Sequence, residues 1–86
     1  MNKQLLDAIA AELAKGNGCM LATVLSRRGS APRGVGTSMV VSCTGNQSGT
    51  VGGGSMEHRV KQDALALLTR QESTIKEYVI HADGKD

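Results

Sequence analysis

The chain has 86 residues with one Tyr and no Trp or Phe, so we expect one small domain with an aliphatic core. Ten basic and eight acidic residues are interspersed and give a net charge of +2, which is too little basic surface to indicate nucleic-acid binding. No segment approaches the roughly 20 apolar residues that a membrane span requires.

The first expected element is an amphipathic helix over residues 2–15. Its polar residues, Glu12 among them, fall mostly on the side opposite the apolar face. The sequence Gly16-Asn17-Gly18 follows and predicts the helix end. The apolar face consists of Leu5, Leu6, Ile9 and Leu13.

Three strands are expected next. Residues 19–25 form a nearly unbroken apolar run, which predicts a strand buried on both faces. Residues 27–36 hold three glycines and the only proline, and we interpret them as an ordered loop. Residues 37–43 then return to a strand pattern, and the turn-forming residues 44–47 lead into a hairpin partner over residues 48–51.

A second amphipathic helix is predicted over residues 55–70, with Ser55 as its N-cap. Residues 74–81 are rich in Ile, Val and Tyr and predict a last strand, before a polar tail. The order α-β-β-β-α-β therefore predicts a single α/β domain over residues 1–86, a mixed sheet packed by two helices. The apolar face of the second helix consists of Met56, Val60, Ala64, Leu67 and Leu68.

The two cysteines, Cys19 and Cys43, lie in apolar runs without a CxxC pair or a Cys/His ligand spacing, so no zinc site is expected. Residues 1–15 lack the continuous apolar region of a secretory signal. We therefore expect a reducing, cytoplasmic compartment in which both cysteines are buried free thiols.

The glycine-rich sequence before the second helix is the strongest candidate site. Gly52-Gly53-Gly54 connects a predicted strand to Ser55 at the helix start. Glycines let a ligand approach the backbone, and the first N–H groups of a helix together with its dipole favour a phosphate or carboxylate. The alternative is a tight turn with an ordinary helix cap. The sequence matches neither a Walker A motif nor a GxGxxG fingerprint.

The second candidate is the loop over residues 28–36. Its proline and glycines favour a fixed loop shape, and Arg33 offers a planar fork for phosphate or carboxylate. A purely structural corner is an equally good interpretation. Glu57 would lie beside a ligand at the glycine turn, although a carboxylate near a helix start is also favoured by the dipole alone. No basic side chain lies next to a serine or cysteine in the pattern of a catalytic nucleophile. We therefore predict no catalytic residues and no enzymatic activity.

Two segments in register resemble the XdhC/CoxI family, the xanthine dehydrogenase accessory factors. They are ATVLSRRGSAPRGVGTSMVVSCTG at residues 22–45 and GTVGGGSMEHRV at residues 49–60. The resemblance implies the N-terminal domain of that family, without the Rossmann-like domain that follows it in full-length members. Family members usually carry a cysteine after the triple glycine, where this chain has Ser55. The candidate binding residues are Ser30, Arg33, Gly52, Gly53, Gly54, Ser55 and Glu57.

The resemblance further implies a module that assists the maturation of molybdenum hydroxylases. Such proteins bind the molybdenum cofactor (molybdopterin), protect it during sulfuration and deliver it to the apoenzyme. The implied partners are the molybdenum hydroxylase apoenzyme and a cysteine desulfurase. From the small core and the apolar strand we expect a homodimer. A non-catalytic dimerisation or docking module that binds no cofactor is the alternative, and an enzyme acting on a phosphorylated small molecule is a weaker one.

Overall fold

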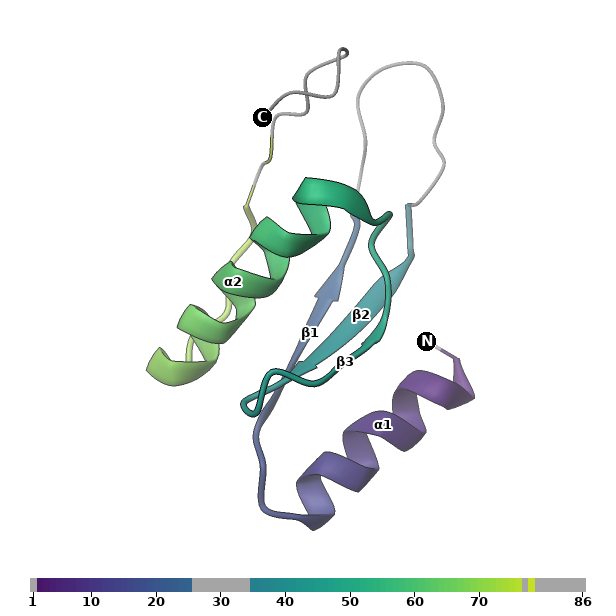
Figure 1. The fold of residues 1–86 in the computed structure, drawn as a ribbon, viewed down its shortest axis with the longest axis vertical. Helices are drawn as coiled ribbons and strands as arrows, with labels where there is room; N and C mark the ends of the chain where they lie inside the picture. The colour runs from purple at the N-terminus through teal and green to yellow at the C-terminus, as the bar shows by residue number, and fades with distance from the viewer. Residues whose placement is uncertain (1, 26–34, 77, 79–86) are drawn as a thin grey trace.

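The structure, a computed structural model, describes residues 2–25, 35–76 and 78 (Figure 1). Within these residues no helix is long and apolar enough to cross a membrane. The elements in chain order are α1 (Lys3–Ala14), β1 (Cys19–Thr23), β2 (Ser38–Ser42), β3 (Gln47–Gly49) and α2 (Gly54–Arg70).

The three strands form one antiparallel sheet in the order β1-β2-β3. Leu21 pairs with Val40 across β1 and β2, and Val40 pairs with Ser48 across β2 and β3. The central strand therefore lies between two short edge strands. The predicted hairpin is confirmed, with β3 beginning one residue earlier than expected and ending at Gly49.

The two helices cover opposite faces of this sheet (Figure 1). Met39 and Val41 of β2 are fully buried beneath α2, where they pack with Val51 and Ala64. Because side chains alternate along a strand, Val40 between them faces the other side, where α1 lies. Leu5 of α1 is also buried on that side. The main core is thus the layer between β2 and α2.

The α/β class and both predicted helices are confirmed. The Asn2 side chain caps α1 by accepting a hydrogen bond from the Leu5 N–H at 2.9 Å. The predicted apolar face of α1 is partly wrong, because Leu13 is 59% exposed while Glu12, expected on the polar side, is 8% exposed. Glu12 faces the sheet because it lies seven residues, about two turns, after Leu5. The Ser42 hydroxyl, Lys15 and Asn17 provide its polar partners.

The prediction that residues 19–25 are buried on both faces is also wrong. β1 is an edge strand with half-buried and exposed side chains, and Leu21 at its centre is 41% exposed. The strand covered on both faces is β2, in which every residue from Met39 to Ser42 is buried. Strand order decides this difference, because only the central strand has a neighbour on each side and a helix over each face.

The described sheet is antiparallel rather than mixed. A parallel pairing depended on the strand expected over residues 74–81, which would follow a helical crossover. Thr74, Ile75, Lys76 and Tyr78 form no strand, and the other residues of that segment lie outside the described part. The described order is accordingly α-β-β-β-α.

Candidate functional site

The glycine turn has a backbone that only glycine adopts readily. Gly52, Gly53 and Gly54 have φ values of 129°, 80° and 69°. A Cβ atom added at any of the three would meet no atom within 4 Å. Backbone conformation therefore requires these glycines, and the space beside the turn is open to an approaching group.

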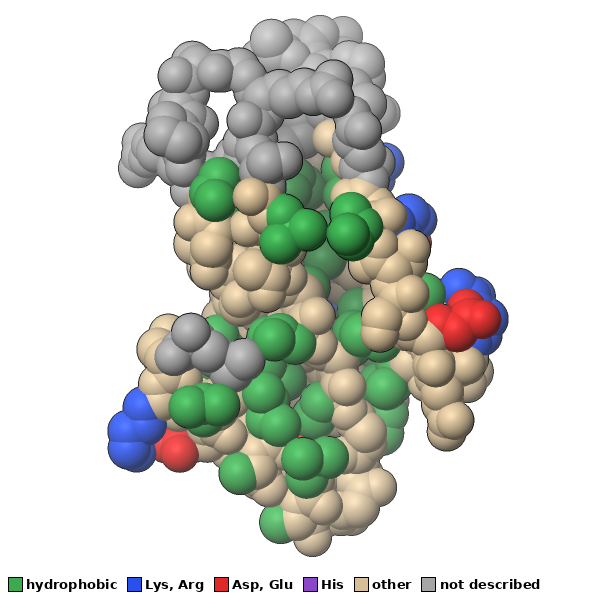
Figure 2. Space-filling view, turned by 180° about the vertical axis from the view of Figure 1, so that it is seen from behind, with side chains coloured by type: hydrophobic (Ala, Val, Ile, Leu, Met, Phe, Trp, Pro, Cys, Tyr) green, Lys and Arg blue, Asp and Glu red, His purple; other side chains and the backbone are tan. Residues whose placement is uncertain are grey.

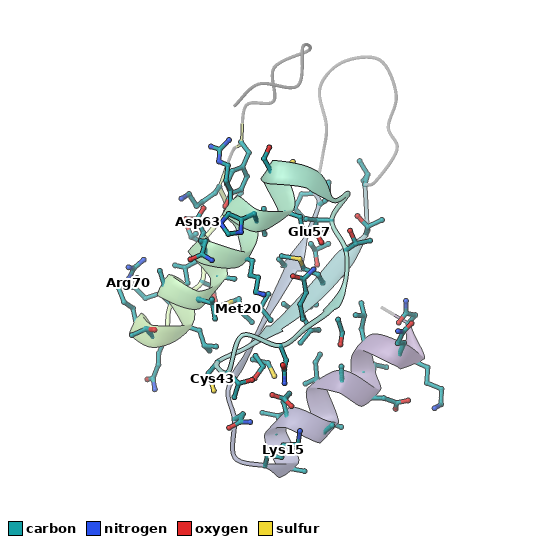
Figure 3. The ribbon with its side chains drawn as sticks, in the orientation of Figure 1. Lys15, Met20, Cys43, Glu57, Asp63 and Arg70 are labelled. Atoms are coloured by element: carbon teal, nitrogen blue, oxygen red, sulfur yellow. The ribbon has the colours of Figure 1, made fainter. Side chains whose placement is uncertain are left out.

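The carboxylate of Glu57 is the centre of the site. Its Oε1 atom accepts hydrogen bonds from the Val51 N–H at 3.0 Å, the Gly53 N–H at 3.1 Å and the Thr50 hydroxyl. Its Oε2 atom accepts one from Gln47 Nε2 at 2.8 Å. Figure 3 shows Glu57 where the start of α2 approaches the sheet. We call this arrangement the Glu57 clasp; it joins β3, the segment after it and the first turn of α2.

These donors stabilise the charged form of the carboxylate. The Thr50 hydroxyl contributes most, followed by Gln47 and the Val51 N–H, and together with the Gly53 N–H they lower the pKa of Glu57 from 4.5 to about 2. Glu57 is therefore an anion at neutral pH. Its negative charge lies at the turn where the sequence predicted that a ligand anion would bind.

The N–H groups of the turn fall into two sets. Those of Val51 and Gly53 are bonded to Glu57, and that of Gly52 is bonded to the Thr50 hydroxyl at 3.0 Å. Those of the first three helical residues, 54–56, have no acceptor among the residues that the structure describes. An anion at this site would have to use the second set.

The other predicted site residues have different outcomes. Ser55 is exposed, and it is not the N-cap; Gly53 holds that position and no side chain caps the helix. The Glu57 carboxylate accepts a hydrogen bond from the N–H of the N-cap residue, Gly53, and leaves the N–H groups of residues 54–56 without a cap among the described residues. Ser30 and Arg33 lie outside the described residues.

Gln47 and Thr50 are site residues that the sequence interpretation missed. A usable signal was present for Glu57 itself, which follows Gly53 by four residues. A carboxylate at that distance can turn back to the N-cap N–H, much as in a capping box. Nothing local marks Gln47 as a donor, because it reaches Glu57 only through the fold of the hairpin.

The thiols and acidic groups make no metal site in the described ranges. No group of three His, Cys, Asp or Glu side chains there is placed to hold an ion. Cys19 and Cys43 are free; burial is the main reason that the pKa of Cys19 is raised. The expectation of two buried thiols is wrong: Cys19 is half-buried, and Cys43 is exposed because it lies one residue beyond β2 in the turn to β3.

A three-stranded sheet with a helix on each face, and a glycine turn leading into the second helix, define a small α/β domain. The chain belongs to the XdhC and CoxI family, whose model matches residues 12–79. This is a family of accessory maturation proteins rather than enzymes, in agreement with the non-catalytic prediction. Membership indicates a role in the maturation of molybdenum hydroxylases or CO dehydrogenase. No curated protein and no solved structure shows a significant match to the chain.

Proposed function

We propose that this domain binds the molybdenum cofactor as cargo during the maturation of molybdenum hydroxylases, holding the phosphate of the cofactor at the start of α2. The observation that carries the proposal is the set of N–H groups at residues 54–56. They lack acceptors among the described residues, and the glycine turn beside them leaves space for a ligand. A helix N-terminus with these properties favours a phosphate.

The Glu57 clasp limits what the site accepts. The Glu57 carboxylate is charged, and the groups that donate hydrogen bonds to it are not free to bind a ligand. It therefore repels a second negative group close to the turn. A ligand with one compact anionic group fits better than a polyphosphate. In this proposal Ser30 contributes a hydroxyl and Arg33 a steering cation, and the cytoplasm is the compartment of the complex.

Ser55→Asp tests the proposal without weakening the helix. An aspartate in the first turn of α2 stabilises the helix through the dipole, but its charge competes with a bound phosphate. We expect titration calorimetry with inorganic phosphate and with molybdenum cofactor to show a loss of affinity of about tenfold or more. Ser73→Asp adds the same charge at an exposed position after α2 and should change little. Equal affinities for the wild type and Ser55→Asp would contradict the proposal.

Ser55→Cys asks whether a thiol at this position matters. If the thiol takes part in sulfur or molybdenum handling, native mass spectrometry should show more cofactor bound to this variant than to the wild type. Unchanged binding would mean that residue 55 contacts the ligand through its backbone N–H group alone.

The second candidate function is a dimerisation or docking module. It is favoured by large apolar side chains at the surface, with Leu6 53%, Leu13 59% and Leu21 41% exposed. Figure 2 shows hydrophobic side chains gathered on the rear side of the molecule. The proposed partners are a second copy of the chain, a molybdenum hydroxylase apoenzyme and a cysteine desulfurase. A folded protein that binds neither phosphate nor cofactor would favour this function.

A further inference from the structure

A cluster of charged side chains on the outer side of α2 is separate from the Glu57 clasp. It surrounds the ring of Tyr78, which is half-buried. The guanidinium carbon of Arg59 lies 5.3 Å from the ring centroid, and the Lys76 Nζ atom lies 5.7 Å from it. Both cations thus lie over the same aromatic ring.

Among the described residues that line this cluster, Asp63 is the one acidic residue, and its hydrogen bonds go to Tyr78 and Lys76 but not to Arg59. Its Oδ2 atom accepts hydrogen bonds from the Tyr78 hydroxyl and from Lys76 Nζ at 3.0 Å (Figure 3 labels Asp63). The Arg59 guanidinium lies over the Tyr78 ring and has no hydrogen-bond acceptor within residues 2–25, 35–76 and 78. Among these residues, two cations therefore face one carboxylate, which leaves one positive charge unpaired in the described part of the cluster.

At neutral pH Asp63 carries its negative charge and Tyr78 is neutral. The Tyr78 hydroxyl and Lys76 lower the pKa of Asp63, so the carboxylate is charged. Burial and the bond to Asp63 raise the pKa of Tyr78 to about 12, so the ring remains neutral.

The cluster also has the shape of a shallow binding site. Its side chains line an open hollow of about 410 Å³. Arg59 presents a planar fork of hydrogen-bond donors. Lys76 presents a compact positive charge over the same ring. These are the two cation types that bind phosphoryl oxygens, the guanidinium in a bidentate manner and the ammonium as a point charge. The hollow is lined by His58, Arg59, Gln62, Asp63, Lys76 and Tyr78.

We propose that this hollow binds a phosphoryl group of a small soluble ligand, with the Arg59 guanidinium as the main contact and Lys76 as the second. The site begins just after Glu57 along α2, so it is distinct from the N–H groups of residues 54–56. Its existence does not depend on cofactor binding at the glycine turn.

Arg59→Gln is the principal test, with inorganic pyrophosphate as the probe. In a two-dimensional NMR titration we expect the wild type to show shifts at residues 58–63 and at the Tyr78 ring. Arg59→Gln should weaken pyrophosphate binding by about tenfold, since a bidentate charged contact is lost. Arg70→Gln is the matched control: it removes the same charge from the same helix, but Arg70 is paired with Glu72 at 3.0 Å.

Three results would overturn the proposal. Equal weakening by Arg59→Gln and Arg70→Gln would indicate a general effect of charge. Shifts confined to residues 52–56 would place pyrophosphate at the glycine turn and leave the proposed function intact. Unchanged affinity in Tyr78→Leu, with the α2 amide spectrum preserved, would show that the ring does not position Arg59.

Discussion

At the residue scale, Glu57 has the most consequence for the candidate site. Its carboxylate accepts hydrogen bonds from two backbone N–H groups and two side chains, which belong to β3 and to the segment between β3 and α2. The glycine turn is consequently held in one shape by an anion that belongs to the protein. A ligand meets a turn that is already organised and needs to occupy only the N–H groups of residues 54–56.

The lowered pKa of Glu57 predicts a pH dependence of stability. A carboxyl group with a depressed pKa in the folded state contributes stability above its unfolded pKa, and this contribution is lost as the pH falls through the folded value. The free energy of unfolding of the wild type should therefore decrease from about pH 4.5 toward about pH 2. Glu57→Gln should be less stable at pH 7 and show a shallower decrease in this window. Urea denaturation across the pH series measures both.

Glu72→Gln provides the control for this experiment. Glu72 is exposed and its ion pair is with Arg70, so its removal should leave the wild-type pH dependence largely unchanged. Glu12 and Asp63 also have lowered pKa values, but they contribute equally to all three proteins. Parallel pH curves for the wild type and Glu57→Gln would refute the role assigned to the clasp.

At the scale of elements, Gly49 sets how closely α1 approaches the sheet. It has a φ of +80°, and an added Cβ would lie 2.5 Å from the Ser38 carbonyl oxygen and 2.8 Å from Leu5 Cδ2. β3, β2 and α1 therefore meet at a place where a methyl group has no room. The burial of Leu5 depends on this close approach.

Gly49→Ala should accordingly destabilise the protein more than a glycine replacement in open space. Gly16→Ala is the matched comparison, because Gly16 has a φ of +81° and no atom within 4 Å of the added carbon. Both variants carry the strain of a positive φ, about 1 kcal/mol or more. Overpacking should add about 1–3 kcal/mol to Gly49→Ala alone. Equal free energies of unfolding for the two variants would show that α1 is not tightly packed there.

The elements show which parts of the fold were predictable. Helices over residues 2–15 and 55–70 were placed to within a residue, because their spacing of apolar residues and their stop signals are local. β1 was mistaken for a fully covered strand, because the order of strands in a sheet depends on distant pairing. The reversed exposure of Glu12 and Leu13 has a similar cause, since one partner that makes Glu12 suitable for burial, the Ser42 hydroxyl, comes from β2 across the interface.

The candidate site was predictable to a comparable degree. Three successive glycines before a helix indicated an unusual turn, and all three have positive φ. The identity of the group that binds the turn was not predictable. Gln47 and Thr50 reach Glu57 only after folding has brought the hairpin and the first turn of α2 together, and this proximity has no signature in the local sequence.

At the scale of the whole molecule, several large apolar side chains lie exposed among the described residues. Beyond α1 and β1, Leu25 is 62% and Ile75 is 82% exposed. Exposed apolar surface of this kind marks interaction sites when it is contiguous. We therefore expect a homodimer, and sedimentation velocity at micromolar concentration should give a species of about twice the 9.0 kDa chain mass. A single 9.0 kDa species over the whole dilution series would argue against it.

The Glu57 clasp also has a consequence for hydrogen exchange. The amides of Val51 and Gly53 lie outside every strand of the sheet, yet both are bonded to a side chain carried by α2. We expect both amides to exchange more slowly than unbonded loop amides, because the Glu57 side chain must move away before either can exchange. Protection of these two amides comparable to that of the sheet would show that the connection between sheet and helix opens together with the elements on either side.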